Sequence, residues 1–242
     1  MGRHSKRRGG HFRVAVVLVA VLCAAILLLR DKVGPKDRDA AAAPAPTAEA
    51  TPEPTPPPTP APTPTPWNLV LVNRANPVPE DWSVTPVELP NGQIVDQRIY
   101  EPLMEMFEAA RGVNMDLLPI VESGYRPIEK QRELYEQRCN EYRQQGYSEA
   151  GARAETEKWV TLPGTSEHQL GIAVDIAGAV YAIYPWLQEN SWQYGFVMRY
   201  PPDKTAITGI SGEEWHYRYV GVPAATEMHE RGLCLEEYLA AD

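Results

Sequence analysis

The first well-patterned stretch of the chain, residues 96–110, repeats its apolar positions with a helical period. Four apolar side chains there recur at intervals of three or four residues, at Ile99, Leu103, Phe107 and Ala110. This spacing places them on one face of a helix, and Gly112 is typical of the position just after a helix ends. Residues 96–110 are therefore predicted to form a helix packed on a core.

Further helices are predicted from charge pattern and end signals. Residues 128–145 form a strongly charged helix, and Ser148 is a suitable N-cap for a helix that runs to about residue 160. Pro223 at a first turn and Gly232 at an end bound a later helix. Residues 235–239 predict a final short turn.

Strand patterns lie mainly between these helical stretches. Branched, aromatic or alternating residues predict short strands at residues 69–72, 117–122, 171–176, 194–198 and 214–220. Helices before and after a cluster of strands indicate an α+β fold with a small, largely antiparallel sheet. The candidate catalytic residues described below fall on the predicted strands at residues 171–176 and 214–220, so we expect the sheet to carry the site.

The N-terminal region is expected to lie outside the folded domain. Residues 1–13 carry five Lys or Arg and no acid, and the apolar run of residues 14–29 follows. Sixteen apolar residues are slightly fewer than the ~20 that cross a bilayer comfortably. We expect residues 14–30 to be a transmembrane signal-anchor, with residues 1–13 in the cytoplasm and the rest outside. The alternative is a cleaved signal peptide and a secreted protein, with a late cleavage site near residues 40–43.

Residues 31–66 are predicted to be a disordered linker. They hold half of the 24 prolines of the chain, mostly in Thr-Pro and Ala-Pro steps. Such a segment cannot bury a core and favours extended polyproline II structure. With a chain of 242 residues, this leaves one ordinary domain, residues 67–242.

Charge excludes one class of partner. The chain has 23 Lys and Arg against 32 Asp and Glu, and its net charge is −9. Without the basic residues of the N-terminal tail, the rest of the chain is still more acidic. Because phosphate binding needs a basic surface, nucleic acid is not an expected partner.

Two cysteines, Cys139 and Cys234, fall in the predicted domain, and Cys23 falls in the apolar run. In an oxidising compartment the two domain cysteines can pair. Two separately buried thiols are the equal alternative, because a sequence does not show whether the Cα atoms are close enough.

The strongest chemical signal is a pair of histidine motifs. Ser166 opens a run that holds His168 and Asp175, and Glu213 lies three residues before His216. Two imidazoles and one carboxylate are the three protein ligands of a catalytic zinc site, which keeps a fourth position for water. A spare carboxylate can accept a proton from that water. Gly171 and Ala173 are expected to keep one face of the intervening strand clear for metal and substrate.

These residues resemble a known family. The pattern Ser-x-His-x-x-Gly-x-Ala-x-Asp, followed by Glu-x-x-His, is similar to that of the zinc D-Ala-D-Ala peptidases, and most of all to the VanY-type D,D-carboxypeptidases. The shared stretches are Leu69-Val70-Leu71-Val72-Asn73, Ser123-Gly124-Tyr125-Arg126, Pro163-Gly164-Thr165-Ser166-Glu167-His168-Gln169 and Trp215-His216-Tyr217-Arg218-Tyr219-Val220. The resemblance covers residues 67–242, roughly.

The resemblance implies a role for each residue of the site. His168, Asp175 and His216 would hold one Zn²⁺, and Arg126 would stabilise the oxyanion. Strand alternation alone favours Glu214 as the general base, whereas the family pattern favours Glu213, which we adopt. Substrate contacts are expected from four further residues, namely Ser166, Gln131, Tyr125 and Trp215.

The implied activity is zinc-dependent removal of the C-terminal D-Ala from peptidoglycan stem peptides, either in wall remodelling or in glycopeptide resistance. Two alternatives remain within the class, a D,D-dipeptidase and a peptidoglycan endopeptidase. An alternative from another class is a zinc-stabilised wall-binding module without catalysis. The presence of both Glu213 and Arg126 favours the enzyme.

Overall fold

The computed structural model describes residues 65–114 and 116–241. The predicted cytoplasmic tail and signal-anchor, and all but the last two residues of the predicted linker, lie outside these ranges. Cys23 also lies outside them. Within the described part of the chain, none of the helices combines the length and the apolar character needed to cross a bilayer.

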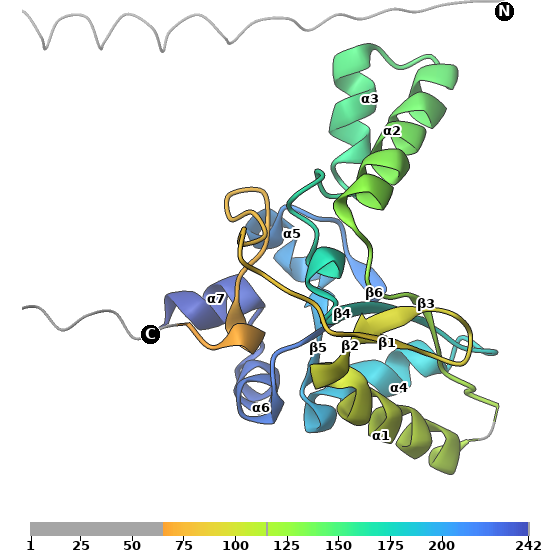
Figure 1. Ribbon diagram of the computed structural model, residues 1–242, viewed down its shortest axis with the longest axis vertical. Coiled ribbons are helices and arrows are strands. Elements are labelled where there is room, and N and C mark those ends of the chain that lie inside the picture. Colours follow the sequence, from red (N-terminus) through yellow and green to blue (C-terminus); the bar gives the residue numbers. More distant parts are fainter. Residues whose placement is uncertain (1–64, 115, 242) are drawn as a thin grey trace, which may run out of the picture. The chain divides into compact units, whose positions relative to one another are not determined.

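The centre of the fold is a four-stranded antiparallel sheet (Figure 1). Its strands are β3 (Ile120–Ser123), β4 (Ala173–Ala177), β6 (Glu213–Tyr219) and β5 (Phe196–Tyr200), in the spatial order β3-β4-β6-β5. Every pairing in it is antiparallel. A separate hairpin joins β1 (Pro86–Glu88) to β2 (Ile94–Asp96). The predicted α+β class with a small antiparallel sheet is confirmed.

The first predicted helix is α1, Gln97–Val113. Asp96 caps it, because its side chain accepts a hydrogen bond from the backbone N–H of Arg98 at 2.9 Å. All four apolar residues that predicted this helix are buried, and they join one core cluster with the inward side chains of β4. The apolar period therefore identified the face that packs on the sheet.

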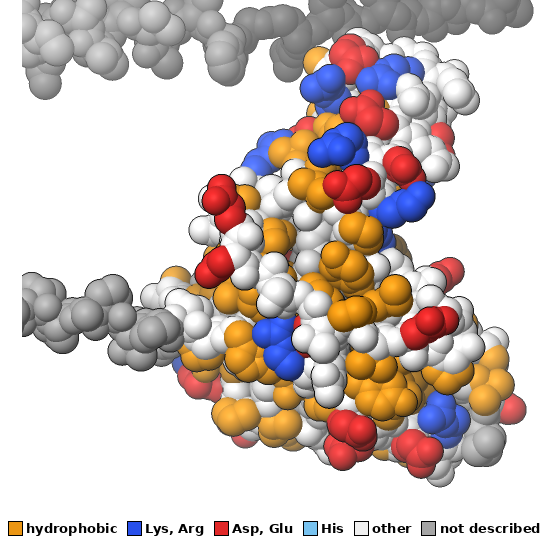
Figure 2. Space-filling view, in the orientation of Figure 1, with side chains coloured by type: hydrophobic (Ala, Val, Ile, Leu, Met, Phe, Trp, Pro, Cys, Tyr) orange, Lys and Arg blue, Asp and Glu red, His pale blue; other side chains and the backbone are white. Residues whose placement is uncertain are grey.

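Six further helices follow α1 among the described residues. They are α2 (Ile128–Gln144), α3 (Glu149–Thr156), α4 (Ile183–Asn190), α5 (Thr205–Thr208), α6 (Val222–Arg231) and α7 (Leu235–Ala240). Short 3₁₀ helices lie at Trp67–Leu69, Glu167–Leu170, Ser191–Tyr194 and Pro202–Lys204. Helices α2 and α3 pack against each other as a hairpin. Figure 2 shows acidic and basic side chains interspersed on the visible face of this hairpin, as expected for a solvated helix pair.

The predicted strand at residues 69–72 is wrong. Leu69 is the last residue of the 3₁₀ helix Trp67–Leu69, and residues 70–72 form no strand. The carbonyl oxygens of Asn68 and Val70 instead accept hydrogen bonds from Arg218 Nη2, at 3.3 and 2.9 Å. Because a buried side chain satisfies this backbone, the segment packs on the core without a sheet partner.

Two predicted boundaries are shifted. Ser148 caps α3 as predicted, with Oγ accepting from Gly151 N at 3.1 Å, but the helix ends at Thr156 and not near residue 160. The predicted strand at residues 194–198 begins at Phe196. Gly195, with φ 82°, separates it from the preceding 3₁₀ helix, because this left-handed conformation ends the helical turn.

The structure decides between the two alternatives for the domain cysteines. Cys139 and Cys234 are both free and both buried. Cys139 lies on the buried face of α2 and packs with Tyr135 and Val160, whereas Cys234 precedes α7. The alternative of two separately buried thiols is the one that the structure shows.

Candidate metal centre

Two of the three predicted ligands face each other across the central strands of the sheet. Asp175 on β4 and His216 on β6 are direct cross-strand partners. Opposed residues of an antiparallel pair bring their side chains together on one face. Asp175 Oδ1 lies 2.8 Å from His216 Nδ1, so the register of the sheet alone assembles these two groups.

The third predicted ligand, His168, comes from the 3₁₀ helix Glu167–Leu170 that leads into β4. Its Nε2 lies 3.3 Å from Asp175 Oδ2, and its Nδ1 lies 2.9 Å from the carbonyl oxygen of Gly124. A carbonyl oxygen only accepts, so Nδ1–H donates and Nε2 keeps its lone pair facing Asp175. The ring is therefore held in the tautomer that a metal needs.

Gly171 has a different place from the one predicted. It ends the 3₁₀ helix with φ 70°, and a Cβ there would lie 3.0 Å from Val84 Cγ1 and 3.3 Å from Asp96. It therefore faces the start of α1 and not the metal ligands. The glycine is required by a positive φ and a close approach of backbone, not by room for substrate.

The three groups fit a zinc ion. The ligand atoms of His168, Asp175 and His216 all lie within 4.8 Å of one another. Asp175 reaches both imidazoles, with Oδ1 2.8 Å from His216 Nδ1 and Oδ2 3.3 Å from His168 Nε2, and three protein ligands are what a catalytic zinc site uses. Two neutral imidazoles with one carboxylate also suit the preference of Zn²⁺.

The electrostatics of the site favour a dication. Burial by itself raises the pKa of Asp175, but His168 and His216 outweigh it and hold that pKa well below its usual range. Burial lowers the pKa of His168, which keeps this imidazole neutral. Burial also acts to lower the pKa of His216, yet its hydrogen bond to Asp175 and the nearby carboxylate of Glu167 raise it to about 9. A proton and a metal ion therefore compete for this imidazole.

Glu213 and not Glu214 opens to the metal centre. Glu213 Oε2 lies 3.9 Å from His216 Nδ1, and its side chain is 8% exposed. Burial, the largest effect, raises the pKa of Glu213 to about 7, against the opposite effect of His216. The carboxylate of Glu214 instead accepts a hydrogen bond from the Tyr181 hydroxyl at 2.7 Å, away from the cleft.

A β-bulge explains why alternation favoured Glu214, whose side chain does not line the cleft. Strands β5 and β6 pair Met198 with Tyr217 and Tyr200 with Glu213. These two pairs are two residues apart on β5 but four apart on β6, so β6 carries extra residues between them. A bulge of this kind breaks the alternation of faces. As a result Glu213 and His216, three residues apart, line the same cleft.

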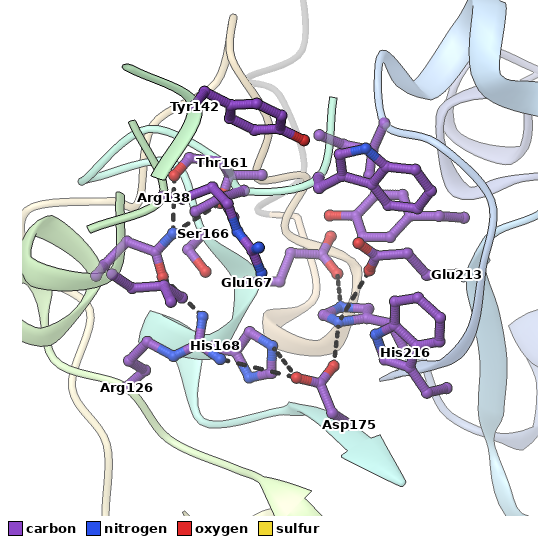
Figure 3. Close-up of a pocket in the computed structure, with 17 residues that line it drawn as sticks. Arg126, Arg138, Tyr142, Thr161, Ser166, Glu167, His168, Asp175, Glu213 and His216 are labelled. Carbon is purple, nitrogen blue, oxygen red and sulfur yellow. Dashed lines mark hydrogen bonds and ion pairs between the residues drawn. The ribbon is translucent and has the colours of Figure 1, made fainter. Parts of the chain in front are cut away.

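Arg126 is held on the other side of the metal ligands (Figure 3). Its Nη2 donates to Ser123 Oγ at 2.6 Å and lies 3.7 Å from Asp175 Oδ2. Its Nη1 donates to Gln131 Oε1 at 2.9 Å, and Gln131 Nε2 donates to the carbonyl oxygen of Thr161 at 2.7 Å. Gln131 was predicted to contact substrate. Its amide is instead engaged on both sides, and it fixes the direction of Arg126.

The metal ligands lie at the base of a cleft of about 430 Å³. Three of the four predicted substrate contacts, Ser166, Gln131 and Trp215, line it. Tyr125 does not, because the chain there runs beside β2, where Tyr125 N donates to Ile94 O, and the next residue, Arg126, is the one that turns into the cleft.

Sequence reasoning missed the outer wall of the cleft. Leu134, Arg138 and Tyr142 continue from Gln131 along one face of α2, and Trp159 also lines the cleft. Their spacing of three or four residues was the available signal. It was not separable from an ordinary packed helix face without knowledge of where α2 lies.

Replacing Gly124 by alanine is expected to destabilise the fold by about 1–3 kcal/mol, the usual cost of overpacking. A Cβ there would lie 2.1 Å from Ile94 O, so backbone must move, and with it the carbonyl oxygen that holds His168 Nδ1. Urea unfolding measures the loss. Gly112→Ala is the control, because no atom lies within 4 Å of its Cβ position. A Gly124→Ala protein as stable as the wild type would contradict the contact.

A carboxylate and an imidazole on an antiparallel sheet, with a second imidazole from the preceding 3₁₀ helix, a buried glutamate and a fixed arginine, define the class of zinc metallopeptidases. The family model described as "VanY: D-alanyl-D-alanine carboxypeptidase" matches residues 92–222. The chain belongs to this family of D-alanyl-D-alanine carboxypeptidases.

Similar proteins support the same assignment. A D-alanyl-D-alanine carboxypeptidase of Enterococcus faecalis is 53% identical over 178 residues, which is 72% of this chain and 66% of that relative. The match thus spans just under two thirds of the relative's own length. Among solved structures, VanYB in complex with D-alanine-D-alanine is 52% identical with a TM-score of 0.70, covering 73% of this chain and 99% of that one. A vancomycin-resistance D,D-pentapeptidase VanY with Zn(II) is also 52% identical, with a TM-score of 0.68, and covers 72% and 99%.

Proposed function

We propose that this chain is a zinc-dependent D,D-carboxypeptidase that removes the C-terminal D-Ala from peptidoglycan stem peptides. The observation that carries the proposal is the convergence of His168, Asp175 and His216 at the base of one cleft with Glu213 and Arg126 on its walls. The zinc-bound and D-Ala-D-Ala-bound structures of similar proteins support it.

The chemistry divides between the metal and the side chains. When bound by His168, Asp175 and His216, zinc supplies Lewis acidity that makes water a nucleophile near neutral pH. Glu213 is placed to accept a proton from the attacking water and to deliver it to the leaving D-Ala amine. Arg126 presents its guanidinium to the scissile carbonyl oxygen as negative charge develops there.

The remaining substrate contacts follow from the lining of the cleft. Ser166 is buried next to His168, where its hydroxyl is available to the peptide backbone. Trp215 contributes an aromatic wall. Gln131 acts on substrate only through Arg126, whose guanidinium it holds.

The length of the cleft favours a peptide longer than a dipeptide. The face of α2 that lines it runs from Gln131 to Tyr142, which spans ~16 Å at 1.5 Å per residue. An extended peptide covers that distance with about five residues. A free dipeptide is too short to contact the whole of this α2 face, so the carboxypeptidase is preferred to the D,D-dipeptidase.

The sequence outside the described residues supports a location for this activity. A basic tail, an apolar run and a proline-rich linker precede the catalytic domain. We place the domain on the outer side of the cytoplasmic membrane, tethered through residues 14–30, where it meets peptidoglycan. Secretion after signal cleavage is the alternative.

Zinc-loaded protein is expected to convert a stem pentapeptide ending in D-Ala-D-Ala into a tetrapeptide and one equivalent of D-alanine. Mass spectrometry of the products, with the free dipeptide D-Ala-D-Ala and an L-Ala-terminated peptide as controls, measures the specificity. Release of the intact dipeptide would favour an endopeptidase, and faster cleavage of free D-Ala-D-Ala would favour a dipeptidase.

The same assay distinguishes zinc chemistry from serine chemistry. Residues 67–242 contain no Ser-x-x-Lys sequence, the motif whose serine penicillins acylate. D-alanine release is expected to be unchanged by benzylpenicillin, and inhibition at low concentration would contradict the mechanism.

A further inference from the structure

The residue just before the first ligand, Glu167, is wholly enclosed, and the proposed mechanism does not use it. Its Oε1 accepts a hydrogen bond from Arg199 Nε at 2.8 Å and lies 3.0 Å from Arg218 Nη1. Its Oε2 has no hydrogen-bond partner among the described residues. One oxygen of this carboxylate is thus fixed by two cations and the other is directed elsewhere.

The free oxygen of Glu167 points at the far side of a metal ligand. It lies 3.9 Å from His216 Nε2, and that nitrogen is likewise buried without a partner among the described residues. Figure 3 shows Glu167 and Asp175 on opposite sides of the His216 ring. A buried donor left without an acceptor is destabilising, and the two atoms would form a hydrogen bond if they moved slightly closer together.

The role of Glu167 depends on which ring nitrogen of His216 would bind the metal. His216 turns Nδ1 toward Asp175 at 2.8 Å, so a metal held with Asp175 takes Nδ1. The neutral ring then carries its proton on Nε2, the atom opposite Glu167. We infer that Glu167 is a positioning residue, whose Oε2 accepts the Nε2–H of His216 and keeps Nδ1 aimed at the metal. The inference rests on the ligand set of the proposed function.

The carboxylate is itself held from outside the site. Arg199 on β5 donates through its two terminal nitrogens to Glu236 of α7, at 2.8 and 2.7 Å. Arg218 on β6 is anchored through the carbonyl oxygens of Asn68 and Val70. Glu167 is therefore held by two cations that come from β5 and β6. This is the rigidity that a group supporting a metal ligand requires.

The 3₁₀ helix Glu167–Leu170 thus serves two ligands at once. His168 points from it toward the other ligands, and Oε2 of its neighbour Glu167 lies 3.9 Å from Nε2 of His216. The two imidazoles also meet edge to face, with centroids 4.8 Å apart. One short turn therefore sets the orientation of both rings.

Zinc affinity of the full chain tests the inference without an activity assay. Competition with a chelator is expected to show that Glu167→Gln weakens zinc binding about 10- to 100-fold, the usual effect of losing a partner of a metal-bound histidine. Glu236→Gln is the matched control. It removes the other carboxylate held by Arg199, yet does not touch His216, so its zinc affinity is expected to stay within about threefold of wild type.

The outcomes separate the possibilities. Equal zinc affinity for Glu167→Gln and wild type would overturn the inference. An equal loss in both variants would also overturn it, because a general weakening of the buried charge network would then explain the effect. If wild type itself binds no zinc, the proposed function fails first.

A second measurement holds even if Glu167→Gln does not fold. The nitrogen spectrum of zinc-loaded wild type, labelled with ¹⁵N-histidine, reports which ring nitrogen carries the proton. We expect a protonated, slowly exchanging Nε2 for His216 and a protonated Nδ1 for His168. A His216 that binds zinc through Nε2 would overturn the inference.

Discussion

Replacing Glu213 by glutamine is expected to lower kcat for D-alanine release by about 10²–10⁴-fold, the usual contribution of general acid–base catalysis, while zinc stays bound. Glutamine keeps the size of the side chain but cannot accept the proton of the attacking water. Glu213 lies 3.9 Å from His216 Nδ1 without being one of the three ligands, and so its loss leaves the metal site intact. Steady-state kinetics with metal analysis of the same sample measures both quantities.

Glu214→Gln is the matched control for this substitution. Its carboxylate accepts from Tyr181 outside the cleft, so kcat is expected to stay near the wild-type value. If Glu214→Gln proved to be the impaired variant and Glu213→Gln the active one, the assignment of the general base would be reversed.

Replacing His216 by alanine is expected to abolish D-alanine release and to weaken zinc binding by more than about 100-fold, the upper range for loss of an outer partner alone. The substitution removes one of three ligands and leaves the Asp175 carboxylate without its 2.8 Å partner. Metal content after dialysis, read with the product assay, measures the effect.

The control for the ligand substitution is His229→Ala. His229 stacks on Trp192 at 4.7 Å, away from the ligands, and does not line the cleft of the metal centre. Zinc content and activity are expected to be unchanged. A His216→Ala protein that kept one zinc ion and full activity would refute the metal centre as described.

Local patterns predicted those parts of the molecule that depend on local chemistry. The spacing of Leu103 and its apolar neighbours predicted α1 and its buried face, because a helix repeats every 3.6 residues whatever it packs on. The histidine motifs likewise pointed to groups that the structure brings together, since β4 and β6 pair Asp175 directly with His216.

The rest depended on contacts between distant segments. A bulge in β6 decides which glutamate faces the cleft, and it arises from the pairing of β6 with β5. Residues 69–72 have the composition of a strand, but Arg218, about 150 positions away, donates hydrogen bonds to the carbonyl oxygens of Asn68 and Val70. The support of His216 by Glu167 needs the positions of β5 and α7 as well. Such pairings follow from tertiary structure, which a single sequence does not display.

The order β3-β4-β6-β5 places Asp175 and His216 on the two inner strands, each with a hydrogen-bonded neighbour on both sides. Asp175 and His216 pair directly with each other, beside the irregular pairing of β6 with β5. Fraying begins at the margins of a sheet, so the backbone of this inner pair is expected to open slowly. Zinc binding then requires little reorganisation of the backbone, so little of the binding free energy is lost in ordering the protein. An enzyme built in this way can lose its metal to a competitor and recover it without refolding.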